Sequence, residues 1–133
     1  MSARRHVLIV DDEPQLRALL EVSLGRRGWT CASSEDPVGA IRILESGAVT
    51  HALVDVHLGA HSGLDLLRTI SARWPDVWLV AMSGASVGTG PAALLAGAAL
   101  FLAKPLTSLR TISDALEGVS PAEEEEDPSV LSG

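Results

Sequence analysis

Short apolar runs alternate along the chain with segments in which apolar residues recur every three or four positions. An apolar run of roughly four to eight residues is typical of a buried strand, and the three-to-four spacing is typical of a helix with one buried face. Such pairs follow one another from the N-terminal region to about residue 119. The predicted strands cover residues 6–10, 29–32, 51–56, 77–82 and 99–102.

Local signals mark where the predicted helices begin and end. Proline fits the first turn of a helix, and aspartate or serine just before that turn can cap it. The second helix should bury Val38, Ile41 and Leu44 and should end at Gly47. The start signals are Pro14, the Asp-Pro pair at 36–37 and the capping-box pattern at 62–65. The predicted helices cover residues 14–27, 37–46, 62–74, 91–97 and 109–119.

Strands that read as continuous apolar runs are buried on both faces, which is typical of a parallel sheet. Right-handed crossover connections then place helices on both sides of that sheet. We therefore predict an α/β fold, a doubly wound five-stranded parallel sheet with five helices, in one domain over residues 1–120. Residues 121–133, rich in Pro, Glu, Asp and Ser, are expected to form an acidic disordered tail or the start of a linker.

Composition narrows the class of protein. Apolar residues make up 47% of the 133-residue chain, enough for a packed core, and charged residues make up 20%. The longest apolar runs fall far short of the roughly 20 residues that a membrane span needs. The apolar run that starts the chain is too short for a signal peptide, and Cys31 is the only cysteine. These features predict a soluble, cytoplasmic protein without membrane insertion.

Charge argues against a nucleic-acid surface. The net charge is −7, and five of the 17 acidic residues lie together at positions 123–127. The rest of the chain carries 12 acidic and 10 basic residues and shows no basic stripe, so direct binding to nucleic acid is not expected. Lys104 is the only lysine in the chain.

Polar residues gather where the predicted strands end. Asp11 and Asp12 follow the first strand, Asp55 lies near the end of the third, Ser83 follows the fourth and Lys104 follows the fifth. Because ligands of such sheets bind at the carboxyl ends of the strands, we expect these side chains to converge. Neighbouring carboxylates repel one another unless a cation lies among them. Mg²⁺ is the hard, oxygen-preferring ion that fits such a site.

These residue types suit phosphoryl transfer. A carboxylate such as that of Asp55 can act as a nucleophile and form an aspartyl phosphate. Transfer also requires neutralisation of the phosphoryl oxygens, for which the metal ion, the Lys104 ammonium and the Ser83 hydroxyl are suitable groups.

Six short motifs, taken together, resemble the receiver domains of two-component signalling, including the chemotaxis regulators. The resemblance covers residues 6 to about 119, and its strength lies in the order and spacing of the motifs. It implies a flavodoxin-like strand order of 2-1-3-4-5. The motifs are Val-Asp-Asp-Glu-Pro (10–14), Leu-Val-Asp-Val-His-Leu (53–58), Gly-Leu-Asp-Leu-Leu (63–67), Ala-Met-Ser-Gly (81–84), Gly-Ala (97–98) and Phe-Leu-Ala-Lys-Pro (101–105).

The resemblance implies a role for each site residue. Asp55 accepts the phosphoryl group and also binds Mg²⁺, together with Asp11, Asp12 and the backbone carbonyl of His57. Lys104 pairs with the phosphoryl group or, before phosphorylation, with Asp55. The peptide bond between Lys104 and Pro105 is expected to be cis, which would set the direction of the lysine.

The resemblance also implies a switch. Ser83 and Phe101 match the family's switch pair: the phosphoryl group draws in the hydroxyl, and the aromatic ring turns into the space that opens. The surface formed by the fourth helix, fifth strand and fifth helix then changes. That surface would control a downstream effector protein and could hold a dimer together.

The expected function is therefore that of a phosphoacceptor signalling switch, not of an enzyme with a separate substrate. A histidine kinase or a phosphotransfer protein would supply the phosphoryl group.

Two features of the sequence depart from the pattern of the receiver family. Gly59 replaces a common proline, and the glycine-rich, uncharged stretch between residues 83 and 104 predicts a short or mobile fourth helix. His57 and Ala85 occupy positions that tune phosphoryl lifetime in this family, and because Ala85 cannot orient a water molecule we expect slow-to-moderate self-dephosphorylation.

Other interpretations remain open at this point. Asp11 and Asp12 could cap the first helix, and Ser83 could be a turn residue. A small phosphatase would carry an Asp-x-Asp pattern and a cap domain, and a flavin or nucleotide binder would carry a Gly- and Ser-rich phosphate loop after the first strand. Neither pattern occurs here. A receiver-like scaffold that is not phosphorylated is the remaining alternative.

Overall fold

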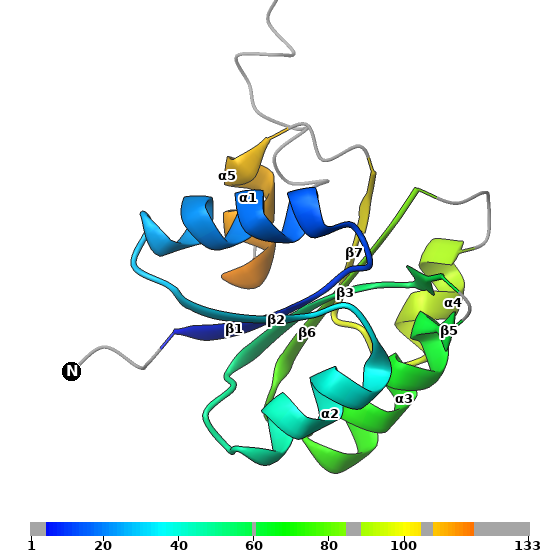
Figure 1. Cartoon of the computed structure of the whole chain (residues 1–133). Helices are drawn as coiled ribbons and strands as arrows, with labels where there is room; N and C mark the ends of the chain where they lie inside the picture. The colour runs from blue at the N-terminus through cyan, green and yellow to red at the C-terminus, as the bar shows by residue number, and fades with distance from the viewer. Residues whose placement is uncertain (1–4, 60, 85–88, 105–107, 119–133) are drawn as a thin grey trace, which may run out of the picture.

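A single parallel sheet organises the computed structural model, which describes residues 5–59, 61–84, 89–104 and 108–118 (Figure 1). The order of its strands is β2-β1-β3-β6-β7, and every neighbouring pair is parallel. The two strands numbered between β3 and β6 form a separate antiparallel hairpin, so the order is the expected 2-1-3-4-5. The sheet consists of β1 (His6–Val10), β2 (Thr30–Ser34), β3 (His51–Asp55), β6 (Trp78–Ser83) and β7 (Leu100–Ala103).

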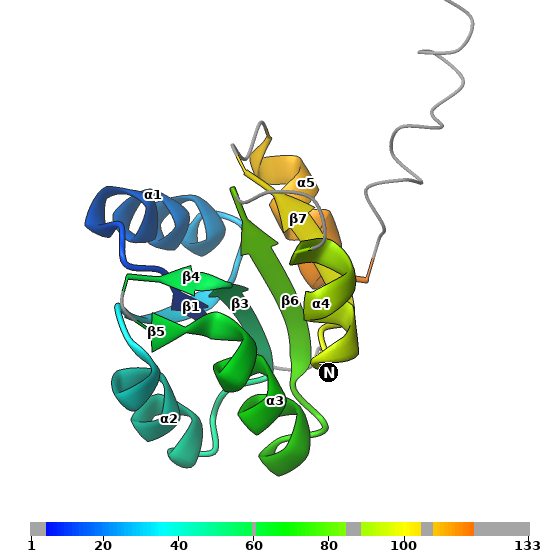
Figure 2. The same cartoon turned by 90° about the vertical axis from the view of Figure 1, so that its right-hand side faces the viewer.

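Helices cover both faces of this sheet, which confirms the doubly wound architecture (Figures 1 and 2). One face carries α1 (Pro14–Gly25) and α5 (Leu109–Leu116). The opposite face carries α2 (Pro37–Glu45), α3 (Gly63–Arg73) and α4 (Thr89–Leu95). No helix among the described residues is long and apolar enough to cross a membrane.

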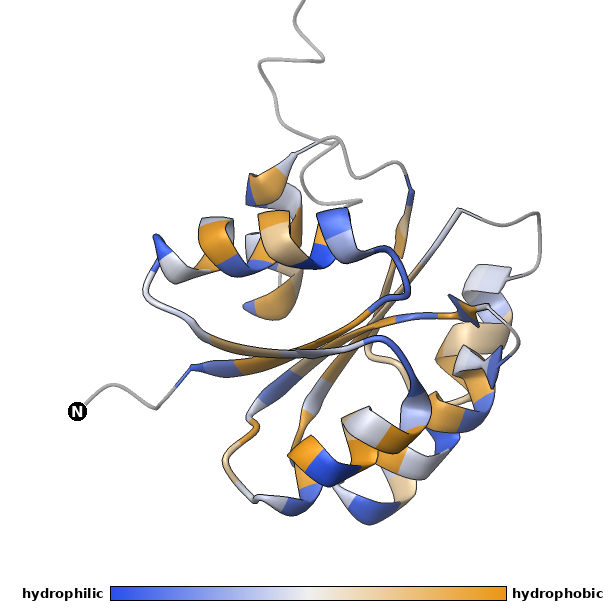
Figure 3. Cartoon of the chain, in the orientation of Figure 1, coloured by the Kyte–Doolittle hydropathy of each residue, from blue (hydrophilic) through white to orange (hydrophobic). Residues whose placement is uncertain are grey.

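The core has two parts, one on each face of the sheet. Alternate residues of each strand point to opposite faces, so one strand contributes to both parts. Leu8 and Val10 of β1, for example, lie on the α2 and α3 side, whereas Val7 and Ile9 lie on the α1 and α5 side, and all four are fully buried. In Figure 3 the middle of the sheet is largely hydrophobic, while the helices alternate hydrophobic and hydrophilic positions.

The predicted start signals act as helix caps or first-turn residues. The Asp36 carboxylate accepts a hydrogen bond of 2.8 Å from the N–H of Gly39 at the start of α2. The Ser62 hydroxyl accepts a bond of 3.4 Å from the N–H of Asp65 at the start of α3. Pro14 occupies the first turn of α1 as expected.

The prediction that Val38 is buried is wrong, because this side chain is 61% exposed. The buried residues of α2 are Ala40 and Leu44, with Ile41 partly buried beside them. At about 100° per residue, a position two residues before Ala40 lies on the opposite side of the helix. The valine therefore faces away from the sheet.

Several element boundaries also differ from the predictions. The loop expected after the third strand contains the hairpin of β4 (His57–Leu58) and β5 (His61–Ser62). The second strand extends to Ser34, although its last residues are not apolar, because β1 pairs with it along its full length. Within the described part of the chain, helix α4 has seven residues, which agrees with the prediction of a short fourth helix. The predicted tail at 121–133 lies outside the described residues.

Candidate functional site

The carboxyl ends of the strands bring three of the predicted site residues into direct contact. Asp11 follows β1, Asp55 ends β3 and Lys104 follows β7. The Nζ atom of Lys104 lies 2.8 Å from Oδ2 of Asp11 and 2.9 Å from Oδ2 of Asp55. The only lysine of the chain therefore joins two carboxylates that are far from it in sequence.

Asp11 is fully buried, and both of its carboxylate oxygens have donors. Oδ1 accepts the N–H of Glu13 at 2.8 Å, and Oδ2 accepts Lys104. The backbone carbonyl of Asp11 accepts a bond of 2.6 Å from the guanidinium of Arg17. Burial raises the pKa of Asp11, and the hydrogen bonds from Lys104 and Glu13 offset this only in part. A cation close to this carboxylate would therefore stabilise its charged form.

Asp55 is also nearly buried, with 4% of its surface exposed. Its Oδ1 accepts the N–H of His57 at 2.9 Å, while its Oδ2 faces Lys104. The start of α3 packs tightly on this segment: a Cβ on Gly63 would overlap the backbone of Asp55 and Val56. Glycine at position 63 therefore allows α3 to begin directly against the backbone at the end of β3.

Lys104 is held by hydrogen bonds of both its backbone and its ammonium group. Its backbone N–H donates to the carbonyl of Ser83 at 2.9 Å, which joins the ends of β6 and β7. Burial acts to lower the pKa of the Lys104 ammonium, but the hydrogen bonds and negative charges of Asp11 and Asp55 outweigh it and raise the pKa above lysine's ordinary value. The ammonium group therefore stays charged throughout the neutral pH range.

Two residues that the sequence analysis did not assign also belong to the site. Glu13 lies 3.1 Å from the Lys104 ammonium through its Oε1 atom. Arg17, one turn further along α1, fixes the Asp11 carbonyl. Glu13 could have been anticipated, because it continues the Asp-Asp run at the end of β1; no signal in the sequence marks Arg17.

The carboxylates form a set suited to a hard divalent cation. Oxygen atoms from four acidic residues, Asp11, Asp12, Glu13 and Asp55, lie within 4.8 Å of one another. All are hard oxygen donors, two of the residues are buried, and the buried Asp11 carboxylate has a raised pKa. These donors fit Mg²⁺. Among the described residues, neither the His57 nor the His61 side chain belongs to this set.

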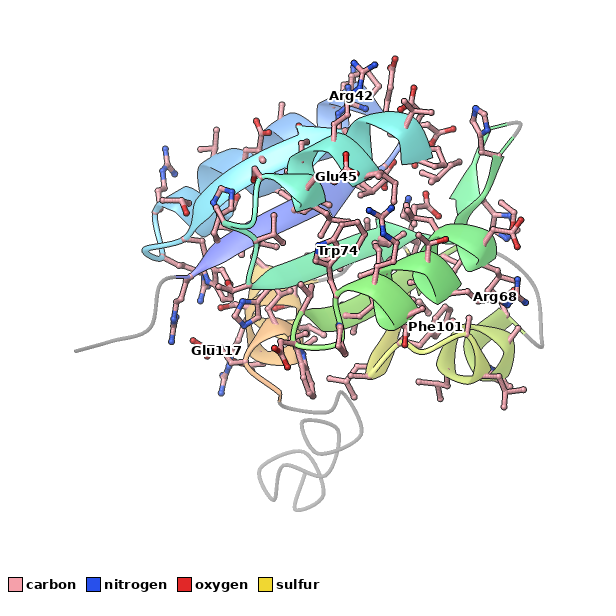
Figure 4. The ribbon with its side chains drawn as sticks, turned by 90° about the horizontal axis from the view of Figure 1, so that it is seen from below. Arg42, Glu45, Arg68, Trp74, Phe101 and Glu117 are labelled. Carbon is pink, nitrogen blue, oxygen red and sulfur yellow. The ribbon has the colours of Figure 1, made fainter. Side chains whose placement is uncertain are left out.

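Ser83 and Phe101 share one face of the sheet. Phe101 pairs with Ala81 in the β6–β7 register, and Ser83 lies two residues further along β6, so both point to the side covered by α4. Ser83 is buried, whereas the Phe101 ring is partly buried beside α4 (Figure 4). The arrangement is compatible with a switch pair. Ala85 and Pro105, with its expected cis bond, lie outside the described residues.

Gly59 stands where the family pattern commonly has proline. The backbone of Gly59 has a φ of +58°, in the turn between β4 and β5. Proline, with φ fixed near −65°, could not adopt this conformation, so the departure from the family pattern has a local structural reason.

The N-cap residue of α1 is Glu13, whose side chain makes no capping hydrogen bond. The interpretation of Asp11 and Asp12 as simple helix caps is therefore wrong.

Comparisons with known proteins agree with this geometry. The model of the response regulator receiver domain family matches residues 7–117. The response regulator protein PilR of Pseudomonas aeruginosa is 38% identical over 105 residues, which are 78% of this chain and 24% of PilR. The chain thus spans about a quarter of that relative.

Solved structures show the same fold. A response regulator protein from Burkholderia pseudomallei, with a phosphorylated aspartic acid, a calcium ion and citrate, has a TM-score of 0.81 and 28% identity, covering 97% of this chain and 75% of that one. The receiver domain of NtrX from Brucella abortus has a TM-score of 0.76 and 29% identity, covering 84% of this chain and 98% of that one.

Proposed function

This chain belongs to the response regulator receiver domains, the phosphoacceptor switches of two-component systems, and from that membership we propose that Asp55 is its phosphoacceptor and that acceptance depends on Mg²⁺. The observation that carries the proposal is the contact of the Lys104 ammonium with both Asp55 and Asp11, beside two further carboxylates. This is the arrangement needed to hold a phosphoryl group on an aspartate.

Asp55 supplies the nucleophile. One of its carboxylate oxygens forms a bond to phosphorus while the bond between phosphorus and a donor histidine nitrogen breaks, and the imidazole leaves with the electron pair. The N–H of His57 holds Oδ1 of Asp55, which fixes the plane of the carboxylate. Lys104, already within hydrogen-bond distance, then neutralises a phosphoryl oxygen instead of the carboxylate.

The acidic residues provide the metal site. Bound Mg²⁺ would neutralise phosphoryl oxygens and draw them toward the carboxylates. Asp11, Asp12 and Asp55 would hold the ion, and the backbone carbonyl of His57 is the expected fourth protein ligand. Glu13 would hold Lys104 near the site when the metal ion and the lysine compete for the same oxygens.

The signal would leave the site through Ser83 and Phe101. The Ser83 hydroxyl binds the phosphoryl group, the Phe101 ring moves, and the surface formed by α4, β7 and α5 changes. On α4 this surface carries exposed apolar side chains: Leu95 is 90% exposed, and its neighbour Leu94 is about half exposed. It would contact an effector protein or a second copy of the chain. The donor would be a histidine kinase or a phosphotransfer protein.

The decisive experiment is intact-mass measurement after incubation with Mg²⁺ and a small phosphodonor such as acetyl phosphate. The wild-type chain should gain one phosphoryl group, and this gain should disappear with EDTA and in Asp55→Asn. Asp65→Asn, which changes an exposed aspartate at the start of α3, is the matched control and should be modified normally. If the wild type stays unmodified, also with a phosphohistidine donor, the scaffold alternative becomes the better one.

A further inference from the structure

Gly90, in the first turn of α4, lies against the ring of Phe101. A Cβ atom on residue 90 would stand 3.2 Å from Cδ2, 3.5 Å from Cε2 and 3.6 Å from Cγ of that ring. Non-bonded carbon atoms are most stable at about 3.5–4.0 Å, so the nearest of these contacts would be too short. The missing side chain at position 90 is therefore what allows α4 to pack on the ring as it does.

The ring is confined on its other side by the sheet. Phe101 belongs to β7 and packs on the core cluster between the sheet and helices α3 and α4 (Figure 4). The nearby buried residues of α4 and the turn after it, Ala93 and Ala96, are also small. The present position of the ring thus depends on close contact with a helix turn that has no side chain at the contact point.

We propose that residue 90 sets the resting equilibrium of the switch, because glycine there stabilises the Phe101 position of the unphosphorylated protein. A methyl group at position 90 would crowd the ring where it now lies and would therefore favour an arrangement in which the ring moves away from this contact. The ratio of the two arrangements should change by about tenfold, a typical consequence of adding one methyl group to a packed contact. The inference rests on the proposed function, since it takes Ser83 and Phe101 as the switch pair.

The composition of the chain provides a direct measurement. Phe101 is the only phenylalanine, and the chain contains no tyrosine. Biosynthetic incorporation of 3-fluorophenylalanine therefore gives ¹⁹F signals from this one ring. Spectra would be recorded for the wild type and for Gly90→Ala, with and without Mg²⁺ and acetyl phosphate.

Gly25→Ala is the matched control. Gly25 is also a helical glycine, the last residue of α1, and a Cβ there would meet nothing within 4 Å. Both substitutions replace a helical glycine by alanine, and only the one at residue 90 places a Cβ against Phe101. Far-UV circular dichroism would establish that both variants are folded.

The expected result is that the unphosphorylated Gly90→Ala ring signal moves toward the position of the phosphorylated wild type, while Gly25→Ala coincides with the unphosphorylated wild type. An unmoved Gly90→Ala signal, or movement away from the phosphorylated position, would overturn the inference. Intact mass of the same samples separates the two proposals. Without a phosphoryl group on Asp55 the proposed function fails, whereas normal phosphorylation with an unmoved Gly90→Ala ring signal removes only the role of residue 90.

Discussion

The two ends of the sheet are built from different chemistry. At the carboxyl end, four carboxylates lie close together, and the Lys104 ammonium group pairs with three of them. At the amino end, rings predominate: Trp29 before β2 meets His51 of β3 edge to face at 4.7 Å, and the Arg5 guanidinium lies 5.2 Å from the Trp29 ring centre. Trp78 completes this amino-end cluster by donating its indole N–H to the carbonyl of Ala115 at 2.9 Å.

This difference means that the carboxyl end can respond to a metal ion or a phosphoryl group, whereas the amino end stays fixed. The energy of the carboxyl end depends on which cation lies among the carboxylates, so a metal ion or a phosphoryl group can rearrange it. The amino-end cluster surrounds a shallow pocket of about 430 Å³ and relies mainly on packing, which does not change with metal or phosphate. Substitutions at the two ends should therefore differ in their dependence on Mg²⁺.

The largest effect is expected at the amino end. Trp29→Ala should lower the free energy of unfolding by roughly 3–5 kcal/mol, because it removes a large buried ring from the core. Urea unfolding followed by circular dichroism would measure this, with EDTA and with Mg²⁺. The loss relative to the wild type should be the same in both conditions; a smaller loss in Mg²⁺ than in EDTA would contradict the separation of the two ends.

The next effect is expected at the carboxyl end and should depend on the metal. Lys104→Met should lower the free energy of unfolding by about 3 kcal/mol in EDTA, because it leaves the buried Asp11 carboxylate without its cation. Because 14% of the Lys104 side chain is exposed, we expect a loss of free energy of unfolding at the low end of the range that is usual for buried ion pairs.

Mg²⁺ should recover much of the stability lost in Lys104→Met, since it neutralises the same oxygens and binds only the folded protein. Arg73→Met is the control: its pair with Glu45 is exposed and should contribute less than about 1 kcal/mol, with or without the metal. An equal loss for Lys104→Met in EDTA and in Mg²⁺ would mean that the lysine acts through packing alone.

A smaller effect tests how the amino end holds α5. Trp78→Phe keeps an aromatic ring but removes the donor to the Ala115 carbonyl, and the free energy of unfolding should fall by about 1 kcal/mol. The urea midpoint would be compared with that of Trp74→Phe, whose indole N–H makes no hydrogen bond among the described residues. Equal midpoints for the two variants would show that the Trp78 hydrogen bond contributes nothing.

The smallest effect is a pH dependence at the amino end. Burial, and to a lesser degree the charge of Arg5, lowers the pKa of His51 below its ordinary value of 6.5. The unfolded chain therefore binds the proton more readily, so stability should fall as the pH drops below about 6.5. Urea midpoints at pH 7.5 and 5.5 should differ more for the wild type than for His51→Gln. Identical differences would assign the pH effect to other groups.

The sequence predicts the carboxyl end well and the amino end poorly. Asp11, Asp55 and Lys104 could be placed together because strand ends of a parallel sheet meet at one edge, and charged residues there stand out from apolar runs. Trp29, His51 and Trp78 lie at the opposite strand ends, but they have no common motif that would predict their cluster.

Details that depend on three-dimensional approach were also missed. The buried face of α2 is marked by Ala40 and Leu44, not by Val38. Alanine is small and only weakly hydrophobic, so the sequence gives little indication that Ala40 is buried. The need for glycine at position 63 follows from how closely α3 approaches the end of β3, which no local pattern reveals. The role of Glu13 depends on the reach of Lys104 from the far edge of the sheet.

Because Lys104 is the only lysine, the centre of the acidic site can be addressed by ordinary amine chemistry. Acylating reagents attack neutral amines, and the carboxylates that raise the pKa of Lys104 keep its neutral fraction small. Anything that withdraws Asp11 or Asp55 from the ammonium group changes the rate of labelling at this one side chain. The labelling rate at Lys104 therefore reports directly on whether the acidic site is held by the lysine or by something else.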